Sequence, residues 1–167
     1  MTKIALALAV GILALSGTVH GYEEWNVNAT SCVADAGSIQ NNLYIGTGGT
    51  VKFASGKTGD IILYCHVPNL TFVPTTFGIT YYDDTPARGN HVTAQLIKMD
   101  MFTGLITRIV TIDSDNGFVS TGGNANTVGH EFVDSYDPKN FAYYIRIDIV
   151  RNSTVANETL YAVGLLN

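Results

Sequence analysis

Apolar and polar residues alternate along most of the chain, which is the pattern expected of β-strands with one buried face. The alternation is cleanest in residues 141–150, where every second residue from Phe141 to Ile149 is apolar or aromatic, and Arg146 and Asp148 occupy the other face. Similar runs, rich in β-branched and aromatic residues, lie at 42–46, 50–53, 60–67, 76–83, 92–99, 105–112, 127–132 and 158–166. The pattern therefore predicts about nine strands.

Outside the N-terminus, no stretch shows a sustained apolar repeat at helical spacing, so a helix of more than two turns is not expected. Many short strands separated by Gly, Pro, Asn and Asp are typical of an antiparallel sandwich or barrel. We predict an all-β fold, a single antiparallel, jelly-roll-like β-sandwich, because two apolar sheet faces can then cover each other.

Residues 1–21 have the features of a secretory signal peptide: a charged start, an apolar run over 4–15 and a small-residue exit. The run is shorter than the roughly 20 residues of a spanning helix, although an uncleaved anchor is the alternative. We expect cleavage after Gly21, leaving one domain of residues 22–167 with no membrane span. The predicted location is secreted or periplasmic.

The charge balance argues against a nucleic-acid partner. The formal net charge is −5, and cleavage would make it −6 by removing Lys3 and no acidic residue. The remaining basic residues are scattered singly, at Lys52, Lys57, Arg88, Lys98, Arg108, Lys139, Arg146 and Arg151. Phosphate backbones are bound by clustered Lys and Arg, which this chain lacks.

The chain contains two cysteines, Cys32 and Cys65. An even pair in an exported protein is most simply a disulfide. This bond would fasten the N-terminal segment to a predicted core strand. A thiol nucleophile or a metal ligand is the less favoured alternative, since a free cysteine suits a reducing compartment better.

Five segments contain most of the strand-like sequence: SCVADAG, GGTVKFASGKTGDIILYCHV, FGITYYDD, VTAQLIKM and NFAYYIRIDIVRNSTVANETLYAVGL. Together they resemble a loose group of small exported bacterial β-sandwich proteins of uncharacterised function. The resemblance spans nearly the whole mature chain and implies a bacterial, exported, single-domain protein. It carries no site residues.

Residues 51–58, VKFASGKT, end like a phosphate-binding loop, but Val51 replaces its first glycine. A strand is predicted to follow at once, whereas a phosphate loop opens a helix. We therefore interpret the segment as a Gly-rich hairpin between two strands.

Residues 113–117, DSDNG, allow two interpretations. Asp113, Asp115 and Asn116 offer oxygen ligands for calcium, but their spacing is one residue short of the usual loop and no Glu follows at the right distance. Asn116 and Gly117 are a strong signal for a two-residue hairpin turn, which we favour. No metal and no other cofactor is expected.

Five aromatic residues are candidates for a carbohydrate-binding surface, because exposed aromatic rings can cover the apolar faces of sugars. They are Trp25, Tyr81, Tyr82, Tyr136 and Tyr144. The alternative is that most of them pack against the sheets or loops.

We expect a non-catalytic exported protein that binds carbohydrate or protein, or that contributes to an envelope or extracellular structure. One alternative is a carboxylate-based polysaccharide hydrolase, with Asp83 and Asp84, or Glu131 and Asp134, facing a cleft. Another is a surface subunit that self-assembles through exposed sheet edges.

Overall fold

The computed structural model describes residues 23–41, 44–84, 89–116 and 124–167. The predicted signal peptide therefore lies outside the described residues. The described part of the chain forms eleven strands, more than the nine expected, and one short helix, α1 (Ala36–Gln40). The strands are β1 (Glu24–Asn28), β2 (Val33–Ala34), β3 (Tyr44–Thr47), β4 (Thr50–Phe53), β5 (Gly59–His66), β6 (Thr76–Asp83), β7 (His91–Asp100), β8 (Ile106–Asp113), β9 (Asn126–Glu131), β10 (Phe141–Arg151) and β11 (Glu158–Leu166).

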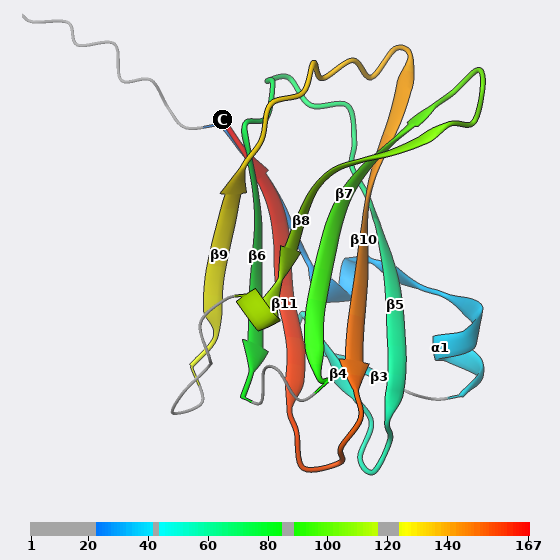
Figure 1. The fold of residues 1–167 in the computed structure, drawn as a ribbon, viewed down its shortest axis with the longest axis vertical. Coiled ribbons are helices and arrows are strands. Elements are labelled where there is room, and N and C mark those ends of the chain that lie inside the picture. The colour runs from blue at the N-terminus through cyan, green and yellow to red at the C-terminus, as the bar shows by residue number, and fades with distance from the viewer. Residues whose placement is uncertain (1–22, 42–43, 85–88, 117–123) are drawn as a thin grey trace, which may run out of the picture.

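Two antiparallel sheets pack face to face, as Figure 1 shows. The six-stranded sheet has the order β3-β4-β11-β6-β9, with β1 also paired to β11. The five-stranded sheet has the order β2-β5-β10-β7-β8. Among the described residues, no helix is both long and apolar enough to cross a bilayer.

The strand pairing confirms the predicted jelly-roll-like sandwich. β4 pairs with β11, β5 with β10, β6 with β9 and β7 with β8. The chain from β4 to β11 is thus a long antiparallel ribbon whose two halves run side by side. The ribbon wraps around the core, and the pairs β6 with β11 and β7 with β10 join its turns into two sheets.

The core lies between the inward faces of the two sheets, where the alternation in the sequence places its apolar residues. Ile145, Ile147 and Ile149 of β10 are completely buried. Phe77 and Ile79 of β6 meet them from the six-stranded sheet within one continuous cluster. Each such side chain contributes about 1.5 to 3 kcal/mol on leaving water, so the inward-facing residues supply much of the stability.

The structure corrects two predicted hairpins. The loop after Phe53 joins β4 to β5, which belong to different sheets, so it is a crossover. At the second site, Asp113 ends β8 opposite Thr93 of β7, and a 3-10 turn, Ser114–Asn116, follows. The next strand, β9, pairs in the other sheet, so Asn116 does not begin a two-residue turn between paired strands. Gly117, the second residue of that predicted turn, lies outside the described residues.

Candidate functional site

The disulfide attaches an N-terminal segment to the edge of the five-stranded sheet. We call this segment, from Cys32 through β2 and α1 to Gln40, the strap. The Sγ atoms of Cys32 and Cys65 are bonded at 2.04 Å, which confirms the predicted pair. β2 follows at once and pairs with β5, where Val33 lies opposite Tyr64. A disulfide is typical of proteins that fold in an oxidising compartment. Export itself stays a prediction.

Helix α1 continues the strap and is stabilised by a side-chain cap. The Asp35 carboxylate accepts hydrogen bonds from the backbone N–H of Ser38, at 2.8 Å, and of Gly37, at 3.3 Å. Hydrogen bonds from Ser38, and to a smaller extent the charge of Arg146, hold the pKa of Asp35 below its usual value. The buried Ser38 hydroxyl accepts a hydrogen bond from the N–H of Ile62, so α1 is fixed to β5.

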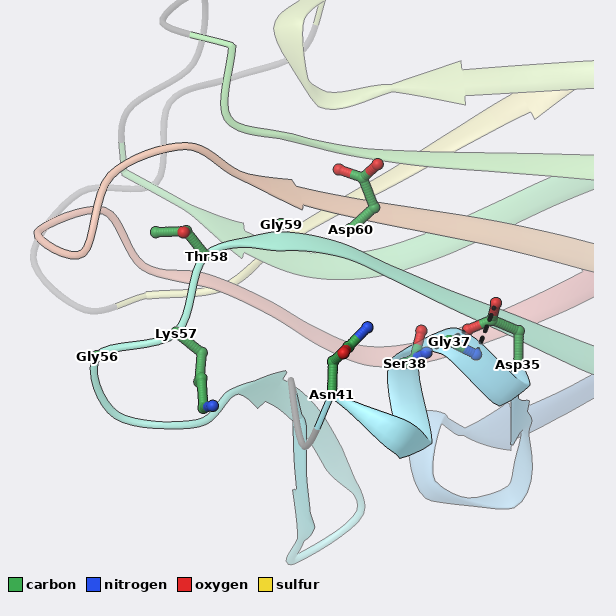
Figure 2. A pocket seen from close by; sticks show the side chains of 9 residues that line it. All are labelled: Asp35, Gly37, Ser38, Asn41, Gly56, Lys57, Thr58, Gly59 and Asp60. Atoms are coloured by element: carbon green, nitrogen blue, oxygen red, sulfur yellow. Dashed lines mark hydrogen bonds between the residues drawn. The ribbon is translucent and has the colours of Figure 1, made fainter.

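A polar pocket of about 570 Å³ opens between α1 and the β4–β5 crossover. Figure 2 shows Asp35, Ser38 and Asn41 on the side of α1, with Lys57 on the crossover; Asp60, at the start of β5, also lines the pocket, but its carboxylate is drawn pointing away from α1. The segment that resembles a phosphate loop lines this pocket, but a strand follows it, as predicted. The pocket lies at one end of the outer face of β5.

The outer face of the five-stranded sheet carries mostly polar and aromatic side chains, with the apolar Ile62 among them. The register places Tyr64, Arg146 and Gln95 in one row across β5, β10 and β7. Ile62, Asp148 and Thr93 form the next row. These side chains are exposed or half-buried, so the face is open to solvent.

Two tyrosines lie next to each other on this face. The ring centroids of Tyr64 and Tyr144 are 6.2 Å apart with 54° between the ring planes. Tyr64 is 40% exposed and Tyr144 is half-buried. His66 is paired with Tyr144 across the strands and continues the aromatic surface.

An ion pair lies beside the two tyrosines. Arg146 donates to the Asp148 Oδ1 atom from Nη2 at 2.8 Å and from Nε at 3.3 Å. The hydrogen bonds to Asp148 raise the pKa of the Arg146 guanidinium above its ordinary value. The two side chains are two residues apart on one strand, so they share a face. Together they offer donors and an acceptor in fixed positions.

The structure separates the five aromatic residues that the sequence suggested for a carbohydrate surface. Tyr81 is completely buried in the core. Trp25 lies on β1 opposite Leu165 and packs partly buried against the core. Tyr82 lies on the outer face of the six-stranded sheet, opposite Thr159.

Tyr136 is used to hold a loop. Its hydroxyl donates to the carbonyl oxygen of Pro68 and accepts from the N–H of Leu70, at 2.9 and 3.0 Å. Its ring packs 4.6 Å from the ring of Tyr143.

Of the five predicted aromatics, Tyr144 is therefore the one that lies beside another exposed tyrosine, and its neighbour Tyr64 was not predicted. The signal for Tyr64 was present in the sequence. Asp60, Tyr64 and His66 alternate with buried residues in β5 and so belong to the outer face.

The acidic residues proposed for hydrolysis do not face one cleft. Asp83 and Glu158 lie opposite each other across β6 and β11 and are 1% and 2% exposed. Asp84, outside the core, accepts hydrogen bonds from Asn157. Asp134 pairs with Lys98.

The candidate calcium ligands are placed at the end of β8. The Asp113 Oδ1 atom accepts a hydrogen bond from the N–H of Asp115 at 3.1 Å, as in an Asx turn. Asn116 ends the 3-10 turn. In the part of the chain that the structure describes, no three His, Cys, Asp or Glu side chains are grouped to hold a metal ion.

Comparison with known proteins gives structural neighbours only. No family model and no curated protein matches the sequence. A carbohydrate-binding module of family 29 is similar over 88% of this chain and 79% of its own, with 12% identity and a TM-score of 0.37. A family two carbohydrate esterase from Cellvibrio japonicus is similar over 87% of this chain but 33% of its own, with 14% identity and a TM-score of 0.41. At these TM-scores the likeness is too loose to bear on function, which has to be inferred from the side chains of this chain.

Proposed function

We propose that the protein binds carbohydrate on the outer face of its five-stranded sheet, at Tyr64 and Tyr144. The observation that carries this proposal is the pair of neighbouring tyrosine rings, one exposed and one half-buried, beside the Arg146–Asp148 ion pair. A sugar ring has an apolar face of C–H groups and an edge of hydroxyl groups. The tyrosine rings supply apolar surface for the first, and the ion pair supplies hydrogen-bonding atoms for the second.

The chemistry of the face favours neutral sugars. The Arg146 guanidinium is already neutralised by Asp148, so it is not a free cation for a sugar acid. The next strand adds uncharged hydrogen-bonding groups, because Gln95 lies beside Arg146 and Thr93 lies beside Asp148. Such groups match hydroxyls, which both donate and accept hydrogen bonds.

The outer face also suits an extended chain of sugars. Along β5, the outer-face residues run from Asp60, in the polar pocket, to His66, about 20 Å away at the rise of a strand. His66 lines a second hollow of about 310 Å³ with Phe141 and Ala142. The tyrosine pair lies between the two hollows, so a polysaccharide could contact all three.

The test is binding to a panel of soluble neutral and acidic polysaccharides, followed by alanine substitution. Tyr64→Ala and Tyr144→Ala should each raise the dissociation constant about tenfold, the effect of losing about 1.4 kcal/mol of contact energy. Tyr82→Ala is the matched control, because that tyrosine is half-buried on the outer face of the opposite sheet. Binding that is lost with Tyr82→Ala but kept with Tyr64→Ala would overturn the assignment.

A further inference from the structure

The turn between β7 and β8 exposes four large apolar side chains. Met101, Phe102, Leu105 and Ile106 are 50%, 83%, 69% and 57% exposed. Figure 1 shows this hairpin extending away from the body of the sandwich. Apolar residues gathered at one exposed place usually mark an interaction surface. We call residues 101–106 the β7–β8 tip.

The backbone of the tip is hydrogen-bonded within the hairpin. The Asp100 carboxylate accepts from the N–H groups of Phe102 and Thr103, each at 2.8 Å. The N–H of Gly104 donates to the carbonyl of Asp100, and the N–H of Leu105 donates to the Thr103 hydroxyl. Gly104 has φ of +72°, a conformation that glycine adopts without strain.

The remaining donor at the start of the tip is also satisfied, because the N–H of Met101 donates to the carbonyl of Asn140 at 3.0 Å. The N–H groups from Met101 to Leu105 therefore all have partners inside the protein. An unpaired N–H group is costly in an apolar medium. Residues 101–105 could enter a bilayer without bringing an unpaired N–H group into it. Because the turn is already ordered, binding costs little conformational entropy.

The shape of the tip suits a bilayer better than a groove on another protein. Met101 and Phe102 lie at the end of one strand, and Leu105 and Ile106 lie at the start of the other. All four are exposed and they come from both strands of the hairpin, so the apolar surface lies on both sides of the turn. A lipid layer can contact such a projection from every side.

The charges around the tip are balanced. Arg108 and Lys139 are exposed close to it in sequence or in space. The carboxylates of Asp100 and Asp137 are held by backbone N–H groups of their own turns. Attraction to anionic headgroups is therefore not expected to dominate.

We propose that the β7–β8 tip is a lipid-insertion element, which places Met101, Phe102, Leu105 and Ile106 in the interfacial layer of a bilayer without a need for anionic lipid. The tip is distinct from the tyrosine pair on the sheet face, although Met101 also lines the second hollow beside His66.

The test uses tryptophan fluorescence, because Trp25 is the only native tryptophan. The full chain carrying Phe102→Trp is mixed with vesicles of neutral phosphatidylcholine. Its emission should shift to shorter wavelength relative to the native chain, and quenchers within the bilayer should reduce it. Val155→Trp is the matched control, since Val155 is 81% exposed in the β10–β11 loop at the other end, and it should show no shift.

A second variant tests the energy of insertion. The double variant Phe102→Ser, Leu105→Ser should weaken insertion of the tip into vesicles about tenfold or more. The readout is oxidation of Met101, which vesicles should slow in the native chain but not in the variant. Vesicle binding without a shift for Phe102→Trp would overturn the proposal and assign attachment to the N-terminal run. A shift that appears without vesicles and grows with protein concentration would overturn it in favour of a second copy of the chain. Absence of any shift would overturn it as well.

Discussion

Glu158 lies directly opposite Asp83 across β6 and β11, inside the sandwich. Among the residues that the structure describes, neither oxygen of the Glu158 carboxylate has a hydrogen-bond partner, and the Arg151 Nε atom is 3.9 Å from Oε2. Burial, with the charge of Asp83, raises the pKa of Glu158 to about 7. This pair makes the stability of the fold depend on pH.

We predict that the free energy of unfolding falls as the pH rises from about 4.5 to about 7. Over that range the unfolded chain releases the Glu158 proton while the folded chain keeps it, so the unfolded state is favoured as the pH rises. The loss is at most about 3 kcal/mol. Thermal melts of Glu158→Gln should show a smaller decline over this range than the native chain. The exposed Glu24→Gln is the control, and an unchanged slope in Glu158→Gln would contradict the prediction.

Removing the disulfide should destabilise the fold by about 3 to 4 kcal/mol, because the bond closes a loop of about 33 residues in the unfolded chain. The measurement is urea unfolding of the Cys32→Ala, Cys65→Ala double variant. Reduction of the native protein is the matched comparison. Equal midpoints with and without the bond would show that the disulfide does not stabilise the fold.

Ser114→Ala should cost about 2 kcal/mol. The buried Ser114 hydroxyl donates to the Asp83 Oδ2 atom at 2.6 Å and accepts from the N–H of Val92 at 2.9 Å. The alanine variant leaves the Val92 N–H without this partner in the interior and takes one hydrogen bond from Asp83. Chemical unfolding measures the loss, for which Ser153→Ala is a control, because Ser153 is half-buried in the β10–β11 loop and its hydroxyl accepts one long hydrogen bond, from the N–H of Val155 at 3.5 Å. A loss below about 0.5 kcal/mol would mean that water replaces the hydroxyl.

Gly164→Ala should destabilise the pairing of β1 with β11. A Cβ atom at this position would be 2.9 Å from the backbone oxygen of Trp25, so one strand must move. Overpacking of this kind costs about 1 to 3 kcal/mol. Gly78→Ala is a close control, because Gly78 is paired with Gly164 and its Cβ would meet nothing nearer than 3.6 Å. Equal unfolding midpoints for the two variants would contradict the steric explanation.

The prediction of strands succeeded because it depends on local alternation, which each strand carries in its own residues. The runs at 76–83 and 158–166 became β6 and β11 with these bounds. The disulfide could also be predicted, since two cysteines allow one pairing. The DSDNG hairpin failed because turn propensity is local, whereas the choice of partner strand depends on residues far away. β8 had already paired with β7 through the turn at residues 101–105.

By itself, the sequence determined the fold class, the inward and outward faces of the regularly alternating run at residues 141–150, and the covalent bond between Cys32 and Cys65. Only the tertiary structure decided which outward residues became neighbours. Tyr64 and Tyr144 are 80 residues apart in the chain, yet pairing of β5 with β10 places their rings 6.2 Å from each other. The physical reason is that alternation depends on the geometry of one strand, while the pairing of strands depends on how the whole ribbon buries its apolar faces.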